Sequence, residues 1–130
     1  MEVRPKMILV VEDEADVREE LVEMLELRRF AVRGEASVAS ALDWLRNATG
    51  QLTLLTDLRL REGSGLDLVR AIRSDTALQA KVSRTILMTG HIDLTEQMER
   101  EIERHDLRIL FKPVELALLL PLLAEDAVLG

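Results

Sequence analysis

The chain has 130 residues, of which 48% are hydrophobic and 32% charged, a composition typical of one globular domain and too apolar for a disordered chain. With 17 lysines and arginines against 24 aspartates and glutamates, the net charge of −7 disfavours nonspecific binding to nucleic acid or anionic lipid. The lack of cysteine excludes disulfides, thiolate catalysis and cysteine-built zinc or iron–sulfur sites.

Neither a signal peptide nor a membrane helix is indicated. The N-terminal residues lack the apolar region of a signal peptide. The longest uncharged stretch, residues 116–124, contains Pro121 and is far shorter than the ~20 apolar residues that span a bilayer. We therefore expect a single cytoplasmic domain over residues 1–130 that does not associate with membranes.

The first half of the chain alternates apolar runs with amphipathic segments. Residues 7–11 read MILVV, which predicts a strand buried on both faces, and residues 15–27 carry apolar side chains at the spacing of a helix. A short strand is predicted at 30–32. The helix after it is expected to be capped by Ser37 and closed by Gly50.

Three further apolar runs predict strands, over residues 52–55, 85–88 and 107–111. The first leads through a polar, glycine-containing loop at 61–65 to a helix capped by Ser64. The second is followed by a helical pattern for which Asp93 is the expected cap. The third ends before Lys112, and a last helix is expected to begin near Val114.

Five strands that alternate with five helices predict an α/β fold with a parallel sheet covered on both faces, since the crossovers between parallel strands are right-handed. In an open parallel sheet, ligands bind outside the carboxyl ends of the strands. The polar residues that follow the predicted strands are therefore the candidate site.

Acidic, hydroxyl and ammonium groups follow four of these strands: Glu12 and Asp13, Asp57, Thr89, and Lys112. Singly, each is more often a turn former or a helix cap, but the combination favours a functional site. Three carboxylates at one edge repel one another unless a cation neutralises them, and oxygen ligands favour Mg²⁺. The set indicates phosphoryl chemistry with Asp57 as nucleophile and Lys112 as the balancing charge.

Four segments carry a resemblance to a known family: MILVVEDE (7–14), LLTDLRL (54–60), ILMTGH (86–91) and FKP (111–113). With these, the chain resembles the receiver domains of bacterial response regulators. The resemblance implies a flavodoxin-like fold with strand order 2-1-3-4-5. It also implies a two-component phosphorelay in which an aspartate accepts a phosphoryl group from a histidine kinase, a phosphotransfer protein or a small donor.

The resemblance also implies residue roles. Asp57 corresponds to the phosphoacceptor, Thr89 to the switch hydroxyl and Lys112 to the lysine that pairs with the phosphoryl group. The metal, Mg²⁺ or Mn²⁺, would be held by Glu12, Asp13, Asp57 and the backbone carbonyl of Arg59. Pro113 is expected to follow a cis peptide bond.

Phosphorylation would add charge and acceptor oxygens that draw Thr89 and Lys112 inward. This would shift the population of a surface formed by the fourth helix, the fifth strand and the fifth helix. The family usually places an aromatic ring at the switch position, here Ile109, so the aromatic form of the switch is excluded. Positions expected to flank the phosphoryl group are Arg59, Gly90 and His91.

The last helix carries more apolar side chains than one core-facing stripe requires, namely Val114, Leu116, Leu118, Leu119, Leu120, Leu122 and Leu123. Two interpretations stay open: a wide buried face, or a homodimer interface that includes this helix. Pro121 predicts a kink, a break or a restart within the helix.

The expected function is a phosphoacceptor switch that is not an enzyme on external substrates, although it hydrolyses its own phosphoryl group slowly. The domain itself is not expected to bind nucleic acid. One alternative is a Mg²⁺-dependent aspartyl-phosphate phosphohydrolase, which would want an acid where the chain has Arg59. The other is a degenerate receiver that acts as a phosphorylation-independent interaction module.

Overall fold

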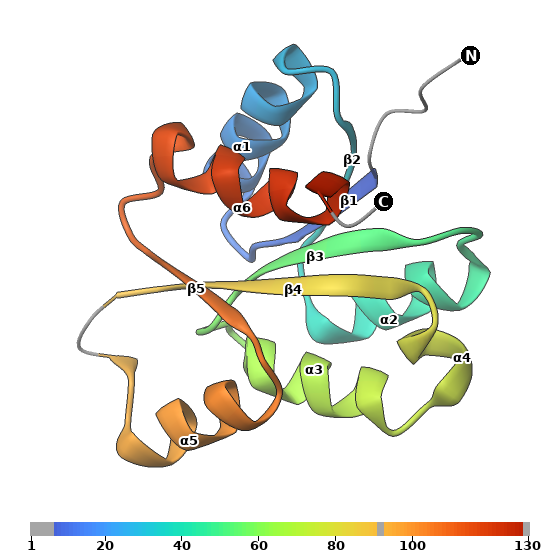
Figure 1. Cartoon of the computed structure of the whole chain (residues 1–130), viewed down its shortest axis with the longest axis vertical. Coiled ribbons are helices and arrows are strands. Elements are labelled where there is room, and N and C mark those ends of the chain that lie inside the picture. The colour runs from blue at the N-terminus through green and yellow to red at the C-terminus, as the bar shows by residue number, and fades with distance from the viewer. Residues whose placement is uncertain (1–6, 91–92, 129–130) are drawn as a thin grey trace.

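The computed structural model describes residues 7–90 and 93–128, and of residues 125–128 it describes the backbone only. Its centre is a five-stranded parallel sheet (Figure 1). The strand order is β2-β1-β3-β4-β5, as predicted. The strands are β1 (Met7–Val11), β2 (Ala31–Glu35), β3 (Leu52–Asp57), β4 (Val82–Thr89) and β5 (Arg108–Phe111).

Two strands extend beyond the apolar runs that predict them. The edge strand β2 pairs with β1 through Glu35 and includes Arg33 and Gly34, because one side of an edge strand tolerates polar residues. Strand β4 begins already at Val82, opposite Leu52 of β3. Backbone pairing therefore sets the ends of these strands, whereas the apolar pattern marks only their buried middles.

Six helices occur among the described residues, one more than predicted: α1 (Ala15–Leu27), α2 (Val38–Asn47), α3 (Gly65–Arg73), α4 (Thr76–Gln79), α5 (Glu96–Arg104) and α6 (Leu116–Val128). The extra helix, α4, is a single turn. The carboxylate of Asp75 caps it by accepting from the N–H groups of Ala77 and Leu78. Four residues are too few to show a helical period, and the fourth and fifth predicted helices are α5 and α6.

The caps decide where the other helices begin. Ser37 and Ser64 cap α2 and α3 as predicted. The prediction of Asp93 as the cap of α5 is wrong, because the Thr95 hydroxyl accepts from the N–H of Met98 and the helix begins two residues later. Helix α2 ends before Gly50, which lies beyond the C-cap at a φ of 81°.

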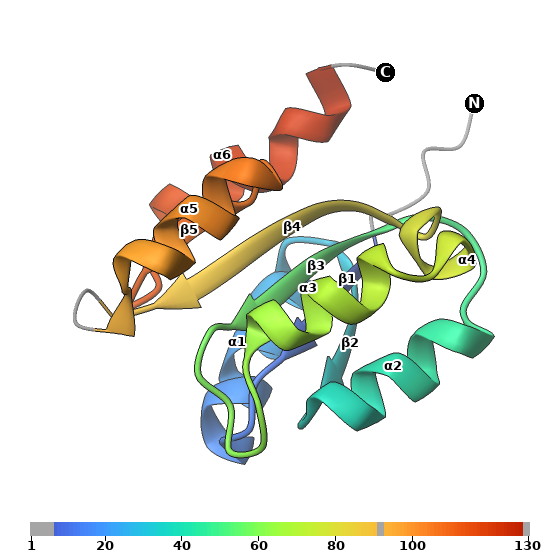
Figure 2. The same ribbon diagram turned by 90° about the horizontal axis from the view of Figure 1, so that it is seen from below.

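Helices α1 and α6 cover one face of the sheet, and α2, α3 and α5 cover the other (Figures 1 and 2). On α6, Leu119 and Leu123 are buried against β1 and β4 residues, with more leucines partly buried beside them. Among the described leucines of α6, only Leu118 is exposed, at 55%. The wide apolar face of α6 is therefore mainly core. The expected break or restart at Pro121 is wrong, because α6 continues through that residue.

None of the helices in the described ranges is both long enough and apolar enough to cross a bilayer.

Candidate functional site

The polar residues predicted from the strand ends gather at the carboxyl edge of the sheet. Glu12 follows β1, Asp57 ends β3, Thr89 ends β4 and Lys112 follows β5. Because β1, β3, β4 and β5 are consecutive neighbours in a parallel sheet, their carboxyl ends meet at the same edge. Four distant parts of the chain thus supply one site.

Three carboxylates form the centre of this site. One ligand oxygen from each of Glu12, Asp13 and Asp57 lies within 4.8 Å of the others. Register explains the contact, since Val11 is opposite Thr56 and the next residue of each strand is a buried acid. Glu12 is 2% exposed and Asp57 5% exposed. The carboxylates are therefore largely removed from the water that would otherwise screen their repulsion.

Lys112 supplies the positive charge of the site. Its Nζ donates a hydrogen bond of 2.9 Å to Oδ2 of Asp57 and lies 3.6 Å from Oε1 of Glu12. The backbone N–H of Lys112 donates to the carbonyl of Thr89, which fixes the residue beside β4. As expected, the peptide between Lys112 and Pro113 is cis.

The environment shifts the proton affinities of all three charged partners. Burial, a hydrogen bond with Asp13 and the charge of Asp57 raise the pKa of Glu12 to about 7. The hydrogen bond from the N–H of Glu14 and the charge of Lys112 lower this pKa, but by less. Burial also raises the pKa of Asp57, although the hydrogen bond and charge of Lys112 oppose it. Burial lowers the pKa of Lys112, but Asp57 and Glu12 outweigh this and raise it overall. One ammonium therefore does not fully compensate the buried acids.

The residues present fit a hard divalent cation. Mg²⁺ and Mn²⁺ prefer carboxylate and carbonyl oxygens, and the described residues bring three carboxylates together without imidazole or thiolate. The raised pKa of Glu12 points the same way, because a cation would supply the charge that Lys112 alone does not. Glu12, Asp13 and Asp57 are the residues that would hold it.

The backbone around Asp57 is held by the loop that follows it. The hydroxyl of Thr56 donates to the carbonyl of Asp57 at 3.0 Å, and the N–H of Gly65 donates to the carbonyl of Leu58 at 2.8 Å. A Cβ on Gly65 would lie 2.5 Å from the Asp57 carbonyl oxygen. Only glycine allows α3 to begin this close to the site.

Among the described contacts, none joins the predicted switch residues Thr89 and Ile109 to the carboxylates. The hydroxyl of Thr89 donates to the carbonyl of Gly90 at 3.0 Å, a bond that it would have to give up in order to donate to a group on Asp57. Ile109 packs with Leu87 and Ile102 in the core between the sheet, α3 and α5. Its side chain therefore belongs to the α5 side of the sheet.

Two arginines in the loop after β3 make contacts that the sequence did not reveal. Nη2 of Arg59 lies 3.4 Å from Oδ1 of Asp93, and the Arg59 side chain is 80% exposed. Nε of Arg61 lies 3.9 Å from Oδ2 of Asp13. The sequence shows arginines and aspartates in the loops that follow the strands, but it does not indicate which arginine lies beside which aspartate. His91, predicted to flank the phosphoryl group, lies outside the described residues.

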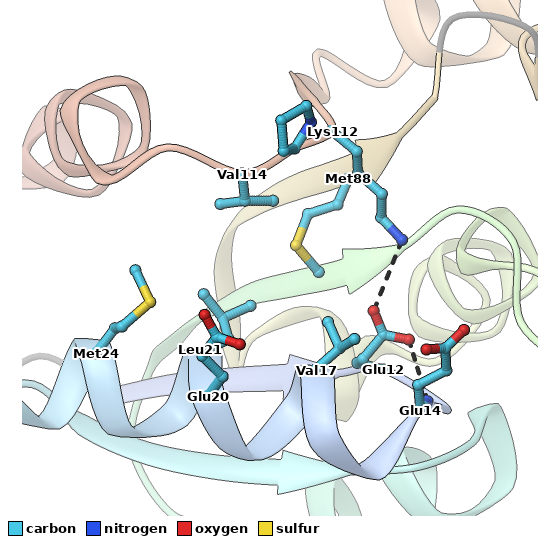
Figure 3. A pocket seen from close by; sticks show the side chains of 10 residues that line it. Glu12, Glu14, Val17, Glu20, Leu21, Met24, Met88, Lys112 and Val114 are labelled. Carbon is cyan, nitrogen blue, oxygen red and sulfur yellow. Dashed lines mark hydrogen bonds and ion pairs between the residues drawn. The ribbon is translucent and has the colours of Figure 1, made fainter.

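A pocket of about 420 Å³ opens beside the carboxylates, between α1 and the segment that joins β5 to α6 (Figure 3). Glu12 and Lys112 form one end of it. Its other walls are mostly apolar and come from Val17, Leu21, Met24, Met88 and Val114. Sequence reasoning missed this pocket because its walls come from α1, β4 and the segment after β5, which only the folded chain brings together.

Comparison with known proteins gives one consistent result. The family model for the response regulator receiver domain matches residues 8–124. Acid tolerance regulatory protein ActR of Rhizobium meliloti (strain 1021) is 34% identical over 86 residues, which cover 66% of this chain and 42% of ActR. The phosphoglycerate transport system transcriptional regulatory protein PgtA of Salmonella typhimurium is 31% identical over 120 residues, which cover 92% of this chain and 27% of PgtA. The chain thus spans less than half the length of these curated relatives.

Solved structures agree with the sequence relatives. A response regulator receiver protein from Pseudomonas putida superimposes with a TM-score of 0.81 at 30% identity, over 96% of this chain and 99% of that chain. A CheY-like receiver domain from Methylobacillus flagellatus has a TM-score of 0.75 at 28% identity, over 92% of this chain and 96% of that one.

Proposed function

The chain belongs to the response regulator receiver domain family, and from this we propose that it is a phosphoacceptor switch in which Asp57 receives a phosphoryl group from a histidine kinase or phosphotransfer protein. The observation that carries the proposal is the contact of Lys112 with Asp57, next to two further carboxylates within 4.8 Å. A switch of this kind needs a nucleophile, a cation site and a counter-charge, and the grouping of Asp57, the two further carboxylates and Lys112 supports these three roles.

The transfer forms a bond between an Asp57 carboxylate oxygen and phosphorus and breaks the bond between phosphorus and the donor, for example an imidazole nitrogen. Lys112 opposes protonation of Asp57, which keeps the nucleophile available despite its burial. The same ammonium can follow the charge onto the phosphoryl oxygens, since it is already 2.9 Å from Oδ2. A Mg²⁺ or Mn²⁺ ion held by Glu12, Asp13 and Asp57 would neutralise the remaining negative charge.

The switch begins at Thr89. Its hydroxyl now donates to a neutral carbonyl, whereas a phosphoryl oxygen is a charged and therefore stronger acceptor. Rotation toward Asp57 would vacate the position beside Gly90. Ile109 on β5 pairs with Leu87 on β4, so the rearrangement can reach the surface formed by α5, β5 and α6 as a population shift.

Loading with beryllofluoride and Mg²⁺ tests this proposal, with an acyl-phosphate donor as a second reagent and intact-protein mass as the readout. The wild type should load or gain one phosphoryl group, and Asp57→Asn should not. Asp43→Asn is the matched control, because Asp43 is an exposed aspartate on α2 whose ion pair in the described part of the chain is with Arg46. Equal loading of wild type and Asp57→Asn would remove Asp57 from the chemistry.

The domain is proposed not to act as an enzyme on external substrates. A phosphohydrolase would use an acid two residues after the nucleophile, and that position holds Arg59, whose guanidinium pairs with Asp93. The retained contact between Lys112 and Asp57 argues against a degenerate receiver. We also propose a cytoplasmic location and no direct contact with nucleic acid, because an acidic surface repels phosphate backbones.

A further inference from the structure

A second groove lies away from the carboxylates and is lined by residues of α5 and of the edge strand β5. These two elements lie side by side at one edge of the sheet (Figures 1 and 2). It has a volume of about 480 Å³, and its apolar lining includes Ile109 and Phe111. These two residues are two positions apart on β5 and therefore face the same side of the sheet. Phe111 is 37% exposed, so an aromatic surface is left open beside the groove.

The rim of the groove is acidic. Glu96, Glu99 and Glu103 all line it, and all three are exposed. Their spacing of three and four residues places them on one face of α5, along about 10 Å of the helix axis at 1.5 Å per residue. Arg100 is the cation among the lining residues. The rim thus carries an excess of negative charge.

Within the described residues, none of these three carboxylates has a side-chain ion pair or hydrogen bond, although Glu96 and Glu99 lie in the first turn of the helix. Glu101 lies on the opposite flank of α5 and binds Arg70 of α3 with two contacts of 2.6 and 2.8 Å. One flank of α5 is therefore tied to α3, whereas the other presents carboxylates without a described ion pair beside the partly exposed Phe111.

We propose that this α5–β5 groove is the docking site for a positively charged protein segment that carries an apolar side chain. Lysines or arginines of the partner would pair with Glu96, Glu99 and Glu103, while its apolar side chain would pack on Phe111 and Ile109. Charge complementarity selects this occupant. A second copy of the same face would place glutamates against glutamates, and a nucleic acid or an anionic membrane would be repelled.

The inference deepens the proposed function, because it names a partner for elements of the surface that phosphorylation is proposed to change. Ile109 links the two, since it lines the groove and pairs with Leu87 of β4, two residues before Thr89. Only the dependence of binding on phosphorylation rests on the proposed function. The groove itself is a feature of the fold.

The test uses a fluorescein-labelled peptide with three lysines on each side of a Leu-Trp-Leu centre, and measures fluorescence anisotropy at low ionic strength. The groove variant Glu96→Gln/Glu99→Gln/Glu103→Gln should bind the peptide about tenfold more weakly than wild type, given three exposed ion pairs. The matched control is Glu19→Gln/Glu23→Gln/Glu26→Gln, which removes the same charge from the exposed face of α1. It should change binding by less than about threefold, because only the long-range attraction is lost.

A second set of measurements tests the apolar contacts of the proposed groove. Phe111→Ala, and a peptide with Ser-Ser-Ser at its centre, should each weaken binding. Equal weakening by the two triple variants would overturn the proposal by showing general charge attraction. A dimer of the wild type that sedimentation detects and the groove variant loses would overturn it in favour of a second copy. Circular dichroism verifies that each variant is folded.

All titrations are run with and without beryllofluoride and Mg²⁺. Peptide binding at the groove without any loading of Asp57 supports the groove even where the phosphoacceptor proposal fails. Successful loading without peptide binding in either state refutes the groove alone.

Discussion

The buried acid Glu12 makes the stability of the metal-free chain depend on pH in an unusual direction. Its pKa is about 7 in the folded chain against 4.5 for an ordinary glutamate. An acid whose pKa is raised by folding keeps its proton longer in the folded state. The stability that it contributes is therefore complete below pH 4.5 and is lost as the pH rises through 7. A rise of this size corresponds to about 3 kcal/mol of unfolding free energy.

Urea unfolding in the presence of EDTA, followed by circular dichroism across this pH window, measures the effect. In Glu12→Gln no carboxyl group titrates at this position. Between pH 4.5 and a pH above 7, the unfolding free energy of this variant should therefore decrease by about 3 kcal/mol less than that of the wild type. Glu23→Gln, an exposed site on α1, should follow the wild type. Adding Mg²⁺ above pH 7 should restore the stability of the wild type, because an ion that binds only the folded state stabilises it.

Parallel pH profiles for wild type and Glu12→Gln would refute the reasoning. The carboxyl groups of Glu12 and Asp57 lie close together, so their titrations are coupled. The midpoint of the observed pH dependence is therefore a property of the pair and not of Glu12 alone. Asp57→Asn is the second variant for this reason. It removes one of the repelling carboxylates and should also flatten the profile.

Three further predictions concern the neighbourhood of the site. Lys112→Ala should slow phosphoryl uptake from an acyl-phosphate donor at least about tenfold, since a hydrogen bond to a charged group contributes roughly 1.5–3 kcal/mol; an unchanged rate by mass spectrometry would contradict this. Gly65→Ala should lower the unfolding free energy measured by urea titration by more than about 2 kcal/mol, because the added Cβ would collide with the backbone of Asp57. Gly34→Ala should lower it less, because there the added Cβ meets the flexible side chain of Arg18. Arg70→Gln and Glu101→Gln should each destabilise by roughly 0.5–1 kcal/mol at this half-exposed pair, and additive effects in the double variant would show that the pair contributes nothing.

The fold was predictable because its central strands β1 and β3 are buried on both faces. MILVV and the other apolar runs are continuous, and no other common element gives five such runs separated by amphipathic helices. The site followed from the same pattern, since residues directly after parallel strands share one edge. This is why Glu12, Asp13, Asp57 and Lys112 could be placed together without coordinates.

Features that depend on tertiary contacts were beyond the sequence. Helix α4 is too short to show a period. Thr95 and Asp93 are both good cap residues in the same segment, and only the folded chain assigns the cap to Thr95 and the ion pair with Arg59 to Asp93. The groove on α5 also needed the structure, because the helical pattern alone does not reveal which glutamates face Arg70 and which face β5.

The arrangement of charge on α5 connects the two ends of the proposed signal. Glu101 is held by Arg70, and Nη2 of Arg73 donates to the backbone carbonyl of His105, so the C-terminal part of α5 is fastened to α3. The N-terminal end of α5 follows the loop that leaves Thr89 and has no comparable tie in the described residues. A displacement that starts at Thr89 would therefore be expressed at the end of α5 that carries Glu96 and Glu99. Those two carboxylates line the groove, so a change of phosphorylation would alter the partner's binding site at its nearest edge.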